Sequence, residues 1–272
     1  MQALNKKYNF LIPVKVGNLK RLGRNGDGGY VVEINTVKNS EILVTFGMGP
    51  DWSFELDYIR ENNKVKIFMY DYSVSSSPYI KSVWKYFRRY ITFRDKNNAL
   101  RDRIKYLNDY FSFFKLKNIN FYPEKITYPI KTKIDADINK VFERIDSEKN
   151  TKGKSIFLKC DIEGSEFELI DEIIKYSNRI NALIFEFHWL DKNEEIFLES
   201  IRKLQEYFDI VHIHGNNHCG KLATGLPITL EMTLLNKKYI LGKKEFIKSF
   251  PRNDLDSPNN PNREDLSLFF NI

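Results

Sequence analysis

The chain has 272 residues, of which 42% are hydrophobic and 29% charged, and its formal net charge is +7 at pH 7. These values are ordinary for one large soluble α/β domain; no apolar run is as long as a membrane-spanning helix, and the first residues lack a signal-peptide core. Two cysteines, Cys160 and Cys219, are too few for a disulfide framework, so we expect a cytoplasmic protein built as a single domain.

Residues 1–40 are expected to form a turn or hairpin that caps the domain. Three glycines and Asp27 fall within residues 26–29, which marks a tight turn, and the β-branched stretch 30–34 after it predicts a strand. Glycine lets a backbone approach a ligand closely, so this turn is either an ordinary hairpin or part of a binding loop.

A glycine turn follows the first buried strand, residues 41–46. Residues 47–49 form a G-x-G step, and a helix is expected to begin after Asp51 or Ser53, either of which is a good N-cap. Trp52 stands where a dinucleotide fingerprint has its third glycine, which disfavours an NAD-binding domain. The strand and its turn still suit a nucleoside lying over the backbone.

The second strand, residues 65–70, ends at Asp71. Nucleotide-binding α/β folds place an acid about 20 residues beyond the glycine turn to hold ribose hydroxyls, and a carboxylate can accept hydrogen bonds from both hydroxyls. A helix N-cap or a surface aspartate is the alternative. The pairing with Gly47 and Gly49 favours the ligand-binding interpretation.

Residues 72–118 make a long excursion before the next strand, and helical spacing predicts two amphipathic helices in it. Residues 81–105 include nine basic and two acidic residues, so this segment carries a charge as large as that of the whole chain. A basic, aromatic insertion favours an anionic partner, and we expect a lid or a substrate-recognition element. In the second helix, the apolar residues expected to face inward are Leu100, Ile104, Leu107 and Phe111.

The chain is organised around a buried strand, residues 155–160, that runs directly into Asp161 and Glu163. An acid that leaves the carboxyl end of a central strand lies where open α/β sheets bind ligands, so we expect Asp161 in the binding crevice. The next helix begins with Glu166 and Glu168, which are expected there because the helix dipole favours negative charge at its N-terminus.

Alternating strands and helices continue to residue 235. They predict a mostly parallel sheet of seven strands, with helices on both faces and right-handed crossovers. The remaining strands are expected at residues 119–122, 182–189, 210–214 and 228–235, with helices at about 135–150 and 194–207. Residues 236–272 predict a polar extended tail without a core of its own.

This layout, with a glycine turn after the first strand and acids after the second and fourth, resembles a class I S-adenosylmethionine-dependent methyltransferase. The individual sequence motifs resemble those of the FkbM-like family. The four matching segments are residues 25–30, 46–55, 159–166 and 214–217. The resemblance implies a Rossmann-like class I methyltransferase fold with a helical insertion. It also implies S-adenosylmethionine as cofactor and O-methylation of a sugar, nucleotide-sugar or surface glycan.

Carried over position by position, the resemblance implies a cofactor site along one edge of the sheet. Gly47, Met48 and Gly49 would pass under the methionine and ribose portions, and Asp71 would hold the ribose hydroxyls. Asp161 would lie near the sulfonium, and Tyr30 would close over the site. The other cofactor-binding candidates are Tyr72, Asn120, Phe121 and Glu124, the last three where adenine is usually contacted.

Methyl transfer to an alcohol is an in-line displacement, and the hydroxyl must lose its proton to a base or to a Lewis-acidic metal. Candidate bases are Asp161, His188 and His214, and histidine is the natural base near neutral pH. Asp161 and Glu186, with His188 two residues on, could instead bind Mg²⁺. The paired-aspartate ligands of metal-dependent sugar O-methyltransferases are not visible, so no metal is assigned.

Further polar residues are expected to hold a small-molecule or glycan acceptor that carries an anionic group. They are Glu163, Asn216 and Asn217 near the strand ends, and Arg88 and Arg89 in the insertion. A zinc site from His212, His214, His218 and Cys219 is a minor alternative, because their spacing matches no common closed zinc site.

Two other functions stay open on the residues alone. A pI of about 9.1 and the Arg- and Tyr-rich helices suit an RNA methyltransferase. The chain has no Asn-Pro-Pro-Tyr-type motif and no separate RNA-binding module, so a nucleic-acid partner is disfavoured. The second open function is that of a non-catalytic binding domain that retains the fold. It stays open because a fold alone does not determine function.

Overall fold

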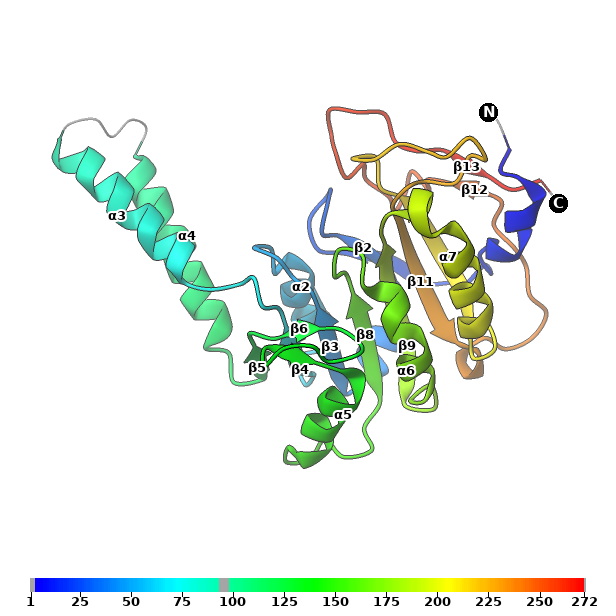
Figure 1. The fold of residues 1–272 in the computed structure, drawn as a ribbon, viewed down its shortest axis with the longest axis horizontal. Helices are drawn as coiled ribbons and strands as arrows, with labels where there is room; N and C mark the ends of the chain where they lie inside the picture. Colours follow the sequence, from blue (N-terminus) through cyan, green and yellow to red (C-terminus); the bar gives the residue numbers. More distant parts are fainter. Residues whose placement is uncertain (1–2, 93–97, 272) are drawn as a thin grey trace.

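A seven-stranded sheet forms the centre of the computed structural model, which describes residues 3–92 and 98–271 (Figure 1). Its strands are β3 (Ile42–Phe46), β4 (Lys66–Tyr70), β5 (Ile119–Tyr122), β8 (Ile156–Cys160), β9 (Ile180–Phe187), β10 (Phe208–Gly215) and β11 (Leu230–Asn236). Their order is β10-β11-β9-β8-β3-β4-β5, and neighbours are parallel except where β11 pairs with β9 and β10. The predicted Rossmann-like architecture, a seven-stranded and mostly parallel sheet, is confirmed.

Helices cover both faces of the sheet. One face packs against α5 (Ile138–Ser147), α6 (Ile170–Ile174) and α7 (Leu190–Leu204), and the other against α1 (Ile34–Asn39) and α2 (Ser53–Glu61). Strands covered on both faces are continuous apolar runs, and every residue of β3, β8 and β9 is buried. The charged members of these three strands are Lys159 and Glu186, each near the carboxyl end of its strand.

An aspartate accepts a backbone hydrogen bond at the start of two of the helices. Asp137 caps α5 by accepting a hydrogen bond from the backbone of the first turn. α2 begins at Ser53, whose N–H donates to Asp51 at 3.0 Å. The helix predicted after Gly164 is a 3₁₀ turn, η2 (Glu166–Leu169), followed by the short α6. In the part of the chain that the structure describes, no helix has the length and apolarity needed to cross a bilayer.

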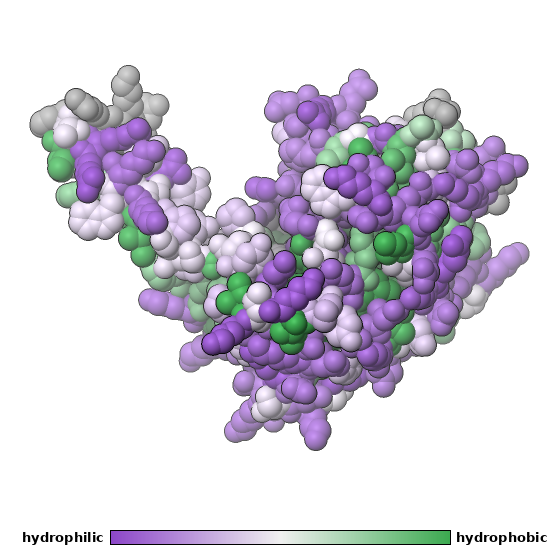
Figure 2. All heavy atoms as spheres, viewed as in Figure 1, coloured by the Kyte–Doolittle hydropathy of each residue, from purple (hydrophilic) through white to green (hydrophobic). Residues whose placement is uncertain are grey.

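The insertion is a helical hairpin, α3 (Ser77–Ile91) and α4 (Ala99–Phe114), that stands away from the body of the domain (Figure 1). The two predicted helices are therefore confirmed, while Arg94 and Lys96 lie outside the described residues. The expectation that Ile104 and Phe111 face inward is wrong, because they are 42% and 39% exposed. In a pair of helices, each helix buries only the side chains along the line of contact with the other. Figure 2 accordingly shows hydrophobic side chains exposed on the surface of the hairpin.

The first and last described segments of the chain lie together on the body of the domain, where the N–H of Leu4 donates to the carbonyl of Phe269 at 2.8 Å (Figure 1). The expected N-terminal hairpin pairs β1 (Leu19–Leu22) with β2 (Tyr30–Glu33), antiparallel. The C-terminal tail is extended, but it docks on the main core, where Phe250, Leu268 and Phe270 are buried. The short elements are η1 (Lys6–Leu11), β6 (Lys125–Ile126), β7 (Asp135–Ala136), η3 (Lys237–Tyr239), β12 (Ser249–Phe250) and β13 (Leu268–Phe269).

Candidate functional site

A cavity of about 750 Å³ lies beyond the carboxyl ends of β3, β4, β8 and β9. Open α/β sheets bind ligands at this edge, and the volume suits a ligand of nucleoside size. Most of the predicted site residues meet here. Those that line the cavity are Gly47, Met48, Gly49, Asp71, Tyr72, Glu124, Asp161, Glu163, Glu186, His188 and Asn216.

Asp71 holds the glycine turn in place. Its Oδ2 accepts from the N–H groups of Met48 and Gly49 at 3.0 and 2.9 Å, and its Oδ1 accepts from the N–H and hydroxyl of Ser73 at 2.8 and 2.6 Å. Burial would raise the pKa of Asp71, but these hydrogen bonds lower it. Because a carboxylate accepts about four hydrogen bonds, Asp71 is occupied by its own loop, whereas the sequence predicted a direct ribose contact.

Lys159 fixes the other side of the turn. Its Nζ donates to the carbonyl of Gly47 at 3.0 Å and lies 3.9 Å from Asp161 Oδ2. The ammonium also lies 5.0 Å from the centroid of the Tyr30 ring, a cation–π distance. The sequence signal for this role is a lone lysine inside an otherwise apolar buried strand.

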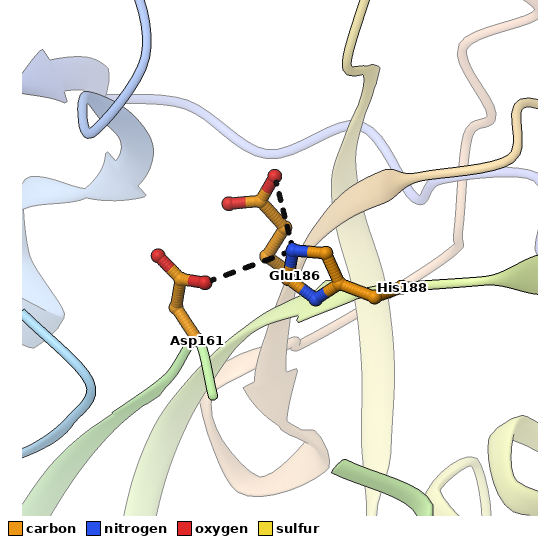
Figure 3. Close-up of side chains that lie close together, drawn as sticks. All are labelled: Asp161, Glu186 and His188. Atoms are coloured by element: carbon orange, nitrogen blue, oxygen red, sulfur yellow. Dashed lines mark ion pairs between the residues drawn. The ribbon is translucent and has the colours of Figure 1, made fainter. Parts of the chain in front are cut away.

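Three side chains at the ends of β8 and β9 form a cluster that we call the cage: Asp161, Glu186 and His188 (Figure 3). Each offers one atom within 4.8 Å of those of the other two. His188 Nε2 lies 3.9 Å from Asp161 Oδ1 and 3.8 Å from Glu186 Oε1. Glu186 and His188 are buried, and the side chain of Asp161 is 23% exposed, so the cage opens toward the cavity.

Tyr30 lies behind the cage and does not line the cavity, which corrects its predicted contact with the cofactor. Its Oη lies 2.8 Å from Asp161 Oδ2 and 3.1 Å from Glu186 Oε2. Burial, together with the charges of Asp161 and Glu186, raises the pKa of Tyr30 well above its usual value. The phenol therefore keeps its proton and bridges the two carboxylates.

Glu166 orients His188, a role that the helix-dipole interpretation missed. It is fully buried, and its Oε1 lies 2.9 Å from His188 Nδ1 while accepting from the N–H groups of Ile162 and Gly164. The intervening Glu163 has a left-handed backbone (φ +58°), which brings those N–H groups round to one oxygen. With Nδ1 engaged, Nε2 of His188 is the nitrogen left toward the cavity.

Carboxylates dominate the electrostatics of the cage. Burial would lower the pKa of His188, but the hydrogen bond with Glu166 and the charges of Glu186 and Asp161 raise it to about 10. Burial raises the pKa of Asp161, and burial with the charge of Asp161 raises the pKa of Glu186 well above its usual value. His188 thus holds its proton at neutral pH in this arrangement, which argues against the free imidazole as the general base.

His214 and Asn217 do not reach the cavity, so neither is a candidate for catalysis or acceptor binding. His214 Nδ1 lies 3.2 Å from Glu231 Oε2, and its Nε2 lies 3.0 Å from Asp265 Oδ2. The Asn217 amide donates to the carbonyls of Asn260 and Arg263 at 3.0 and 3.2 Å. Both residues connect the end of β10 to the C-terminal tail, which the sequence predicted only as a polar extended segment.

Four more predicted site residues also lie away from this cavity. Asn120 and Phe121 lie in β5, where the Phe121 ring packs against Phe114 at 4.7 Å between centroids. Arg88 and Arg89 are exposed on α3. Among the described residues, the cage is the cluster with metal-binding spacing, and the zinc alternative does not assemble.

The hairpin reaches the site through a second cavity of about 520 Å³. The two cavities share Gly49, Pro50 and Ser73 in their walls. The hairpin residues in the second cavity are Pro78, Tyr79, Ser82, Arg103 and Tyr106. The base of the insertion therefore lies beside the glycine turn, whereas Arg88 and Arg89, farther along α3, line neither cavity.

Known proteins resemble this chain in structure rather than in sequence. No family profile matches the chain, and no curated protein matches its sequence. Similar solved structures include precorrin-6y C5,15-methyltransferase from Geobacter metallireducens GS-15, at 11% identity and a TM-score of 0.36, covering 75% of this chain and 86% of that one. The fibrillarin pre-rRNA processing protein of Methanococcus jannaschii is 11% identical, with a TM-score of 0.38, and the match covers 74% of this chain and 68% of that one. Spermidine synthase from Thermotoga maritima is 12% identical, with a TM-score of 0.36, and the match covers 75% of this chain and 56% of that one. Likeness at this level says nothing of the reaction.

Proposed function

We propose that the protein is an S-adenosylmethionine-dependent methyltransferase that methylates a hydroxyl group of a sugar, nucleotide-sugar or surface-glycan acceptor. The observation that carries the proposal is a single cavity shared by the glycine turn after β3, the acid after β4 and the cage. A cofactor over the turn and an alcohol at the cage would lie side by side, and alignment of reacting atoms supplies much of the rate of an in-line displacement.

The glycine-turn end suits the cofactor. A Cβ at Gly49 would meet no atom within 4 Å, so a ligand can pass close to the backbone there. Tyr72 is 57% exposed and lines the same cavity, where its ring can face a base. We assign Gly47, Met48, Gly49, Tyr72 and Glu124 to the cofactor and Asp71 to positioning the turn. When bound, the cofactor would supply the electrophilic methyl group.

The cage end suits a polyhydroxylated acceptor. Carboxylates, an imidazole and the amide of Asn216 line it, and such groups hydrogen-bond hydroxyls readily. Asp161, Glu186 and His188 would hold the acceptor hydroxyl, and the carboxylate of Asp161 would take up its proton. An anionic group of the acceptor would be repelled by these acids and would face Arg24 and Lys125, which also line the cavity.

Membership of the FkbM-like family is part of the same proposal. The four sequence segments that resemble the family's motifs lie close together in the fold, and this supports the proposal. Tyr30 of the first piece bridges the carboxylates of Asp161 and Glu186, and Gly47 of the second accepts from Lys159 of the third. Asn216 of the fourth donates to Glu186 at 2.8 Å.

Asp71→Asn is expected to weaken binding of S-adenosylhomocysteine by about 10- to 100-fold in calorimetry, because an amide cannot replace the charge-assisted hydrogen bonds to both sides of the loop. Cys219→Ala is the matched control, since Cys219 lines the same cavity without contacting the turn, and it should bind normally. If the wild-type protein binds neither S-adenosylmethionine nor its product, the methyltransferase proposal fails and a non-catalytic domain is left. Mass spectrometry of nucleotide-sugars incubated with protein and cofactor then tests the acceptor class.

RNA methylation is a second candidate, which the surface of the hairpin favours. α3 has no acidic residue, and Trp84 and Tyr90 on it are 60% and 61% exposed. Cationic side chains neutralise phosphates, and exposed aromatic rings stack on unpaired bases. The basic residues of α3 are Lys81, Lys85, Arg88 and Arg89.

If RNA is the substrate, changing those four residues to Gln should weaken binding of single-stranded RNA. It should also flatten the salt dependence of binding, by about 0.7 in slope for each phosphate that the variant no longer neutralises. Fluorescence anisotropy across a salt series measures both effects. Lys149→Gln with Lys152→Gln is the control, because these exposed lysines precede β8 at the opposite edge of the sheet. Unchanged RNA binding in the α3 variant would remove this candidate.

A further inference from the structure

We propose that the cage is a site for a divalent transition-metal cation, bound by Asp161, Glu186 and His188 with Glu163 as a fourth ligand. The cation site is argued from the cage alone. That the cation would activate the acceptor hydroxyl rests on the proposed function.

The separations within the cage match a metal centre better than a set of direct contacts. His188 Nε2 lies 3.9, 3.8 and 3.7 Å from oxygens of Asp161, Glu186 and Glu163, too far for hydrogen bonds. One ligand atom of each of Asp161, Glu186 and His188 lies within 4.8 Å of those of the other two, a spacing at which a single divalent cation can bond all three.

His188 provides an independent sign of a ligand. The residue is only 8% exposed, and among the described residues no group accepts or donates a hydrogen bond at its Nε2, which faces the carboxylates across the cage (Figure 3). Its Nδ1 lies 2.9 Å from Glu166 Oε1. Metal-bound histidines are held in the same way, with the second ring nitrogen donating to a carboxylate, and a metal that binds at Nε2 would displace the proton from that nitrogen.

Hydrogen bonds from neighbouring side chains also orient the carboxylates of Asp161 and Glu186. Tyr30 bonds Asp161 at Oδ2, and Oδ1, the oxygen that faces His188, has no hydrogen bond in the described part of the chain. Glu186 is held at both oxygens: Tyr30 Oη lies 3.1 Å from Oε2, and Asn216 donates at 2.8 Å to Oε1, the oxygen nearest His188. Outer hydrogen bonds of this kind preset the direction of metal ligands.

The excess negative charge of the site favours the binding of a cation. The carboxylates of Asp161, Glu163, Glu166 and Glu186 converge on the imidazole of His188, and the protonated ring together with the ammonium of Lys159, 3.9 Å from Asp161, balances only two of these four acids. Buried carboxylates require a paired cation or a metal. Because one ligand is an imidazole nitrogen, the set suits Mn²⁺, Fe²⁺, Co²⁺ or Zn²⁺ better than the Mg²⁺ suggested by the carboxylates alone.

Titration of chelator-treated full-length protein with Co²⁺, followed by visible absorption, tests the site, with Mn²⁺ calorimetry as a second probe. We expect one saturable site and d–d bands. Glu186→Gln and His188→Gln should each weaken binding by at least about 10-fold. Glu163→Gln should have a smaller effect, because its side chain is 79% exposed. His218→Gln is the matched control, since His218 lines the cavity outside the cage, and it should bind Co²⁺ normally.

Absence of saturable binding of Co²⁺, Mn²⁺ and Zn²⁺ at millimolar concentration would overturn the proposal, as would equal Co²⁺ binding by the Glu186→Gln, His188→Gln double variant. Circular dichroism of each variant shows that loss of binding is not loss of fold. S-adenosylhomocysteine calorimetry on the same samples separates the two proposals: cofactor binding without metal binding removes only the cation site, and the reverse removes only the methyltransferase assignment.

Discussion

Gly47→Ala should be the most damaging single substitution at the site. A Cβ at this position would lie 1.7 Å from the carbonyl oxygen of Asp161, and the backbone there is left-handed at φ +68°. The clash is with backbone at the adjoining ends of β3 and β8, so the two strand ends would have to separate. We expect the free energy of unfolding to fall by more than about 4 kcal/mol, and binding of S-adenosylhomocysteine to be abolished.

Gly49→Ala is the matched control, because Gly49 has a similar backbone (φ +57°) but open space around the added Cβ. Its free energy of unfolding should fall only by the energy that a non-glycine residue needs to adopt the left-handed conformation, about 1–2 kcal/mol. Urea denaturation gives the stability of both variants. Equal stability would show that the contact between Gly47 and Asp161 does not set the geometry of the site.

His214→Gln should destabilise the protein in a pH-dependent way. Burial would lower the pKa of His214, but Asp265 and Glu231, with Asp256 farther off, raise it to about 10 from 6.5. Because the folded-state pKa is the higher one, the stabilisation is fully present below pH 6.5 and is lost as the pH rises through about 10. We expect a difference on the order of 4 kcal/mol between wild type and variant at pH 6, shrinking steadily toward pH 10.

Urea denaturation at a series of pH values measures that difference. The variant also leaves Glu231 and Asp265 without their cation, so the tail that carries Asp265 should become more accessible to limited proteolysis. His218→Gln, a change at an exposed position just after β10, should alter neither measurement. A difference in stability that is independent of pH would mean that the charge of His214 does not hold the tail.

Local pattern predicted the elements that build the cavity. Continuous apolar runs predicted β3, β4 and β8, because strands covered on both faces need no polar side. The residues at their ends, Gly47, Asp71 and Asp161, were predicted to share one edge, since parallel strands point their carboxyl ends the same way. The two insertion helices also followed from spacing, although their exposed faces did not.

Side-chain roles in the site were harder to predict, because they depend on partners distant in sequence. Glu166 has the position of a helix-dipole residue, yet it is buried against His188. Tyr30 was expected over the cofactor and instead bridges two carboxylates behind the cavity wall. Lys159 could be recognised as unusual within its strand, but not as the donor to Gly47.

The sequence by itself determined the order of the seven sheet strands and the edge of the sheet where polar groups gather, because apolar periodicity and glycine turns act over a few neighbouring residues. Only the tertiary structure decided which acids pair with which histidine. His188 and His214 are alike in sequence, each followed closely by polar residues, but one faces the cavity and the other the tail. That difference arises from packing between strands and the C-terminal tail, and no local pattern encodes it.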